Sequence, residues 1–178
     1  MKNKVAFTAI LLVIMCSCQK DPTPISLPDE VNFNESVVFL NGELSSGYKP
    51  VFFYQKVNKI MTYGFVERVD DIINSVGFDL LPLSTGNFGV HTQHVVSAFD
   101  AETNFNQTVN EDLEGYSYKL IDTDEGFFKV ESMDTIQQIV KGRFQAKFKR
   151  TSKNGNKDLG LSKILLFQGV FHEHYDIK

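Results

Sequence analysis

The four histidines come closest to a metal-binding pattern. They form two pairs, His91 with His94 and His172 with His174. On a β-strand, His172 and His174 project from one face about 7 Å apart, a separation that two ligands of one Zn²⁺ ion can adopt. Glu173 projects from the opposite face, and His91 and His94 diverge because their spacing is odd. Without a third ligand, we predict no metal site and exposed histidines near strand ends.

Motifs that indicate catalysis are missing from the sequence. There is no Gly-x-Ser-x-Gly elbow and no glycine-rich phosphate loop. The two cysteines, Cys16 and Cys18, both lie near the N-terminus, so the remaining chain has no thiol nucleophile and no disulfide. The formal net charge of −4 does not suit a nucleic-acid partner. We predict a non-enzymatic protein without a cofactor.

Cys18 is the residue with the clearest predicted chemistry. Residues 1–17 combine Lys2 and Lys4 with the apolar run Val5–Met15, which is typical of a bacterial secretory signal. The run is too short to span a bilayer. The segment Met15-Cys16-Ser17-Cys18 resembles a lipobox, in which the last cysteine receives a diacylglyceryl group. We therefore predict lipidation of Cys18 and a membrane partner reached through acyl chains. The alternative is an ordinary secretory signal with incidental cysteines.

Residues 18–30 are expected to be a tether between the lipid and the folded domain. Gln19, Lys20 and Asp21 resemble the export signal that sends lipoproteins of Bacteroidetes, Flavobacteria especially, to the outer face of the outer membrane. Prolines at 22, 24 and 28 favour an extended chain. This pattern predicts a lipid-anchored protein of the outer membrane, displayed at the cell surface. A plain linker, with the domain on the periplasmic face, is the alternative.

The sequence from residue 31 to 178 reads as a single all-β domain, because apolar residues recur with period two. About nine or ten short strands favour an antiparallel β-sandwich, with a closed up-and-down, lipocalin-like barrel as the alternative. Asn41-Gly42 is a strong hairpin signal. Residues 67–75 are a candidate short helix, and residues 101–114 read as a long acidic loop. The expected strands are Ser36–Leu40, Val51–Val57, Ile60–Glu67, Val76–Leu80, Phe88–Val90, Val95–Phe99, Tyr116–Leu120, Phe128–Val130, Ile139–Lys149 and Lys163–Tyr175.

The strand Ile139–Lys149 carries a candidate binding face. One face holds Gly142, Phe144, Ala146 and Phe148, and the other is basic. A basic strand face can bind acidic glycans, phosphates or an acidic protein. A merely solvated face, whose lysines discourage aggregation, is the alternative. The cations of this possible basic binding face are Lys141, Arg143, Lys147 and Lys149.

Several motifs resemble those of a family of Bacteroidetes lipoproteins. Phe39-Leu40-Asn41-Gly42 opens the domain, and Asp134-Thr135-Ile136 leads to Ile139-Val140-Lys141-Gly142-Arg143-Phe144. The resemblance covers about residues 36–175, and it implies an all-β domain in the cell envelope without a known active site. Asp134-Thr135-Ile136 also resembles the acceptor for O-glycosylation in Bacteroidetes, which makes Thr135 a possible modified residue.

These observations together predict a lipid-anchored, non-catalytic binding or structural module. Its ligands would be glycans, host molecules or a protein. The alternatives are a component of a periplasm-facing envelope complex and a barrel that carries a small apolar ligand.

Overall fold

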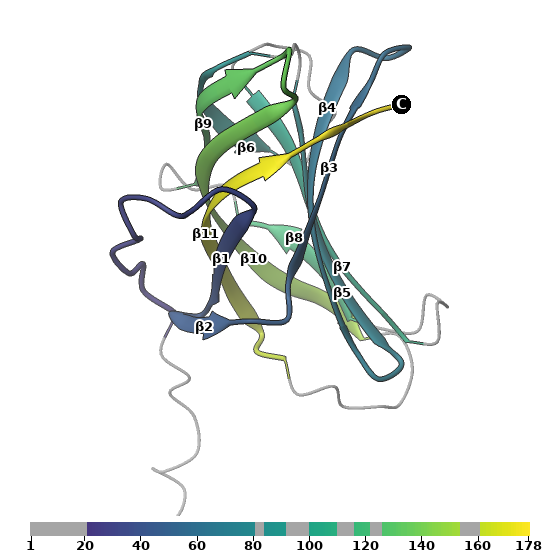
Figure 1. Cartoon of the computed structure of the whole chain (residues 1–178). Helices are drawn as coiled ribbons and strands as arrows, with labels where there is room; N and C mark the ends of the chain where they lie inside the picture. Colours follow the sequence, from purple (N-terminus) through teal and green to yellow (C-terminus); the bar gives the residue numbers. More distant parts are fainter. Residues whose placement is uncertain (1–20, 81–83, 92–99, 110–115, 122–125, 154–160) are drawn as a thin grey trace, which may run out of the picture.

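The computed structural model describes residues 21–80, 84–91, 100–109, 116–121, 126–153 and 161–178. These residues form a mixed sheet of 12 strands (Figure 1). The strands are β1 (Glu35–Leu40), β2 (Glu43–Ser45), β3 (Lys49–Gln55), β4 (Ile60–Val69), β5 (Ile72–Leu80), β6 (Gly86–His91), β7 (Asp100–Val109), β8 (Tyr116–Leu120), β9 (Phe127–Asp134), β10 (Ile139–Lys153), β11 (Ile164–His174) and β12 (Asp176–Ile177).

The sheet folds over into two facing halves. One half contains β3, β4, β5 and β7, and the other contains β9, β10, β11, β1 and β2. The halves are joined by β6, which pairs with β7 and β9, and by β8, which pairs with β7 and β10. Most pairs are antiparallel, whereas β6–β7 and β12–β3 are parallel. Because β12 and β2 stand at the two ends of the strand order, the sheet is not closed into a barrel.

Aromatic rings fill the space between the two halves. Phe65 on β4 lies 4.6 Å from Phe144 on β10, and Phe52 on β3 lies 5.1 Å from Phe171 on β11, measured between ring centroids. Phe128 on β9 packs 4.7 Å from Phe78 on β5. Such edge and tilted contacts stabilise a core beyond the burial of apolar area. The result is a sandwich-like all-β fold with one continuous aromatic core.

Two glycines on β10 and β11 make room for two of these rings. In the β10–β11 register, Gly142 is opposite Phe171, and Gly169 is opposite Phe144. A Cβ on Gly142 would lie 2.6 Å from Cζ of Phe171, and a Cβ on Gly169 would lie 2.5 Å from Cζ of Phe144. Each phenylalanine ring therefore lies over the glycine of the opposite strand, and neither position has room for a larger residue.

Several sequence predictions are confirmed. The fold is all-β, and Asn41-Gly42 forms the β1–β2 turn with φ angles of 55° and 85°, as a type I′ turn requires. The alternation along β10 is also present, with Gly142, Phe144, Ala146 and Phe148 buried towards the core.

Other expectations were wrong. Residues 67–75 are not a helix, because they form the β4–β5 hairpin, and residues 100–109 are the strand β7 rather than a loop. The closed-barrel alternative is not observed. The expected strand Val95–Phe99 lies outside the described residues.

We expect Gly169→Ala to lower the free energy of unfolding by about 1–3 kcal/mol, because the added methyl group collides with the Phe144 ring and with the carbonyl of Val37. Urea denaturation followed by circular dichroism measures the change. Val57→Ala in the turn between β3 and β4 is the control, since the Val57 side chain is 93% exposed. Equal stability of wild type and Gly169→Ala would contradict this account of the core.

Candidate functional site

The outer face of β10 carries the predicted cations. Lys141, Arg143, Lys147 and Lys149 all project away from the core, as the period-two pattern predicts. Arg143 donates from Nε to Oε1 of Glu131 on β9 at 2.7 Å, and Lys129 lies 3.5 Å from the same oxygen. A charged network therefore links β9 to β10 on this face.

Residues 21–31, which we name the N-terminal strap, run across this outer face. Nζ of Lys147 lies 3.3 Å from Oδ2 of Asp21, and Nζ of Lys141 lies 2.9 Å from Oε1 of Glu30. Arg143 donates to the carbonyl oxygen of Asp29 at 3.0 Å. Residues 21–30 of the predicted tether therefore pack on the sheet.

Gln168 on β11 binds the middle of the strap. Its Oε1 accepts from the backbone N–H of Ile25 at 3.3 Å, and its Nε2 donates to the carbonyl oxygen of the same residue at 3.4 Å. Nε2 also donates to Oε1 of Gln145 at 2.9 Å. The Gln168 side chain is only 1% exposed although it points away from the core. A buried amide that meets both main-chain groups of one residue holds an extended chain in a fixed register.

The strap changes the character of the basic face. The side chains of Lys141, Arg143 and Lys147 retain 20%, 24% and 21% of their exposure, whereas Lys149 remains exposed. The hydrogen bond from Lys141, with the attraction of its charge, lowers the pKa of Glu30. The open basic face that the sequence suggested is thus mostly occupied, because acids of the same chain neutralise it.

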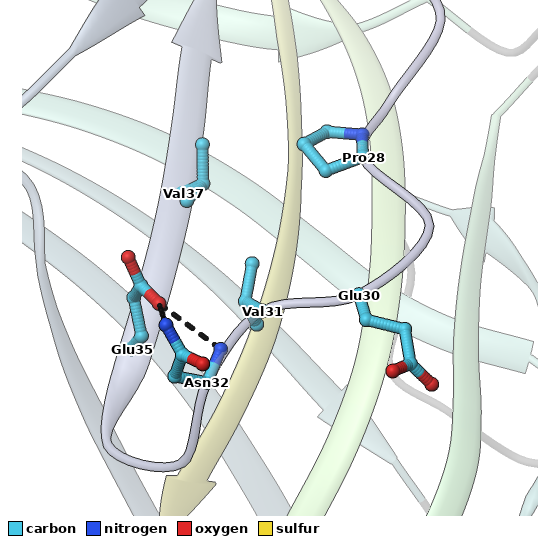
Figure 2. A pocket seen from close by; sticks show the side chains of 6 residues that line it. All are labelled: Pro28, Glu30, Val31, Asn32, Glu35 and Val37. Atoms are coloured by element: carbon cyan, nitrogen blue, oxygen red, sulfur yellow. Dashed lines mark hydrogen bonds between the residues drawn. The ribbon is translucent and has the colours of Figure 1, made fainter.

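A hollow of about 340 Å³ opens between the end of the strap and β1. Figure 2 shows that Asn32 turns towards Glu35, whose Oε2 accepts from the Asn32 backbone N–H at 3.0 Å and from Nδ2 at 2.9 Å. These bonds close the turn that leads from the strap into β1. The hollow is lined by Pro28, Glu30, Val31, Asn32, Glu35 and Val37.

The C-terminal histidine pair packs around an aromatic ring. His172 and His174 share a face of β11, and the Phe33 ring lies 5.4 Å from the first and 4.8 Å from the second. Nδ1 of His174 is 3.3 Å from the carbonyl oxygen of Gln138. Within the described part of the chain, no three His, Cys, Asp or Glu side chains gather as metal ligands. The side chain of His91 and all of His94 lie outside the described residues.

Glu173 is a buried carboxyl group that the sequence analysis treated only as a neighbour of the histidines. It points to the opposite face from them, as predicted, and is 9% exposed. Burial raises its pKa, and a 2.8 Å hydrogen bond donated by Ser36 offsets part of this increase. Its position near the core therefore disfavours the ionised carboxylate relative to the protonated carboxyl group.

A set of hydrogen-bonded polar side chains joins four strands at one end of the core. Gln107 on β7 donates to Oδ1 of Asn74 on β5 at 2.8 Å, and Asn74 donates to Oε2 of Glu67 on β4 at 3.0 Å. Ser45 on β2 donates to the other oxygen of Glu67 at 3.1 Å. These bonds link polar side chains that point inward, so hydrogen bonds hold this end of the core together, while the buried Oε1 of Gln107 has no hydrogen-bond partner among the described residues.

Thr135 lies in an exposed turn between β9 and β10. Oδ1 of Asp134 accepts from the backbone N–H groups of Ile136 and Gln137 at 2.8 and 2.9 Å, and Ile136 is 91% exposed. An enzyme can therefore reach Thr135. Cys18, Gln19, Lys20 and the predicted signal at residues 1–17 lie outside the described residues.

The sequence did not predict that the strap docks on the sheet, nor that Gln168 binds it with Gln145 as its neighbour. One signal was present: residues 164–171 of β11 are apolar on both faces apart from Gln168 and Gly169. A strand that is apolar on both faces requires a cover on each side.

Comparisons with known proteins give no relative. A scan against protein-family models, a search of curated proteins and a search of solved structures each return no match. No helix in the described part of the chain is long and apolar enough to cross a membrane.

We expect Gln168→Leu to loosen the strap, because it removes both hydrogen bonds to Ile25 while keeping the side-chain volume. Each such bond contributes about 1 kcal/mol, so hydrogen exchange at the Ile25 amide should accelerate roughly 5- to 30-fold. Mass spectrometry of residues 21–31 measures the rate. Gln137→Leu in the exposed β9–β10 turn should leave it unchanged. Equal exchange in wild type and Gln168→Leu would show that Gln168 does not hold the strap.

We expect Glu173→Gln to stabilise the protein at neutral pH. The raised pKa of Glu173 means that its contribution is fully present below the unfolded value of about 4.3 and is lost as the pH rises through the folded value. Glutamine keeps an acceptor for Ser36 and carries no charge. Urea denaturation at several pH values should show that the free energy of unfolding of the variant, relative to that of wild type, increases as the pH rises. Exposed Glu43→Gln is the control, and a constant difference across the pH series would refute the assignment.

Proposed function

We propose that the chain is a lipid-anchored lipoprotein of the outer membrane, displayed at the cell surface, whose domain is a non-catalytic binding or structural module. The observation that carries the proposal is the lipobox-like segment ending at Cys18, followed after two residues by a strap that docks on the domain. A chain attached to lipid at Cys18 would hold its domain close to the membrane surface.

The described outer face supports binding rather than catalysis. Its charged side chains pair with one another and with the strap, as in Arg143–Glu131 and Lys141–Glu30. Such an arrangement suits the binding of an extended chain, because side chains on the sheet pair with both the carboxylates and the main chain of the strap. The β-sandwich supplies a rigid support, and Gln168 and the cations supply the contacts.

A periplasm-facing component of an envelope complex is the second candidate, since the same anchor serves both locations. The filled aromatic core favours either of these over a carrier of an apolar ligand. Phe144 alone contacts the rings of Phe65, Phe78, Phe128, Phe167 and Phe171, so rings occupy the space in which a carrier would hold its ligand.

We expect Cys18→Ala to abolish incorporation of radiolabelled palmitate in a bacterial host that exports lipoproteins, and Cys16→Ala to leave it intact. In intact cells, protease should digest the wild-type domain if it is displayed outward, and lysed cells provide the control. Labelling of Cys18→Ala would refute the anchor. Protection of the labelled protein until lysis would replace surface display with the periplasmic candidate.

A further inference from the structure

The strap is held on the sheet by side-chain contacts alone. None of its residues belongs to a strand, and its contacts with β10 and β11 are made through Lys141, Arg143, Lys147 and Gln168. The carboxylates of Asp21 and Glu30 are 70% and 78% exposed, so water and salt screen both ion pairs. A segment held in this way opens more readily than the sheet beneath it.

The face beneath the strap is built to receive an extended acidic peptide. Gln168 meets the N–H and the C=O of Ile25, which are the two groups that every residue of an extended peptide except proline presents. Gln145 fixes the orientation of that amide from the neighbouring strand. Cations lie on both sides along β10, with Lys147 towards the start of the strap and Lys141 towards its end.

We propose that the outer face of β10 and β11 is a docking site for an extended acidic segment of a partner protein, and that the strap is its built-in occupant. The partner's segment displaces the strap and takes over its contacts. The inference rests on the proposed role as a binding module, and it names the partner's chemistry and the regulation of the site. Recognition of main-chain N–H by Gln168 favours a peptide over a glycan.

The test uses the full mature chain purified in detergent and a fluorescent peptide with the sequence of residues 19–32 as the probe. Wild type should bind the peptide weakly, because its own strap competes at high effective concentration. A chain with Asp21→Asn and Glu30→Gln has a weakened strap and should bind the peptide about 10-fold more tightly, as expected for the loss of two exposed ion pairs. Fluorescence anisotropy measures both affinities.

Three matched controls distinguish docking of the peptide from general electrostatic attraction. Asp70→Asn with Asp71→Asn removes two exposed acids in the β4–β5 turn, on the half of the sandwich opposite to β10 and β11, and it should leave the peptide affinity unchanged. Adding Lys141→Gln and Lys147→Gln to the weakened-strap chain should abolish the gain. A peptide carrying the Asp21→Asn and Glu30→Gln changes should bind the weakened-strap chain about 10-fold less tightly than the native peptide.

Three results would overturn the proposal. The first is an unchanged affinity in the weakened-strap chain, whether or not hydrogen exchange at Ile25 shows the strap released. The second is an equal increase in affinity for the peptide that carries the Asp21→Asn and Glu30→Gln changes. The third is displacement of the native peptide by heparin as effectively as by unlabelled peptide, which would indicate a site for polyanions in general. Palmitate labelling and protease accessibility are measured independently, so failure of the proposed location is distinguishable from failure of this site.

Discussion

The reciprocal pairing of phenylalanine and glycine across β10 and β11 is the constraint on which the rest of the structure depends. Gly142 faces Phe171 and Gly169 faces Phe144, so each ring fills the space that the opposite residue leaves empty. A slip of one residue would turn the rings outward and place polar side chains in the core. The register of β10 and β11 is thus set by space-filling, and contacts of their rings with rings on β3, β4 and β5 orient the other half of the sandwich on them.

The same register determines the outer face. Once Phe144 and Phe171 point inward, Gln145 and Gln168 must form a cross-strand pair outside, with Arg143 beside Val170. On the outer face, the side chains of β11 are too apolar to remain exposed to water. Those of β10 are basic, so apolar residues alone cannot cover them. The strap meets both requirements, because it brings the Ile25 backbone to Gln168 on β11 and the carboxylates of Asp21 and Glu30 to β10. The core packing and the strap are therefore consequences of one strand alignment.

The strands could be predicted from the sequence where the buried positions are apolar. They could not be predicted where polar side chains point towards the core. The turn at Asn41-Gly42 and the alternation along β10 were readable because each position shows the residue type that its environment requires. In β7, Thr103 and Gln107 face the core around Phe105, and the bond from Gln107 to Asn74 replaces an apolar contact. The period-two pattern of apolar residues is therefore absent from β7, and the sequence did not predict this strand. The strap was missed for a related reason: its prolines are typical of a linker, and its partners lie more than 100 residues away in sequence.

A docked strap also sets how far the domain can lie from its anchor. Cys18 precedes Asp21 by three residues, so an extended chain separates their Cα atoms by at most about 11 Å. With the strap released, the thirteen Cα–Cα steps from Cys18 to Val31 would reach roughly 45 Å in an extended chain. In the lipid-anchored protein that we propose, occupation of the β10–β11 face by another acidic segment would therefore change two properties together. When a partner segment displaces the strap, the domain can move several times farther from the membrane. The reason is that residues 21–31 both cover the β10–β11 face and connect the domain to its lipid anchor.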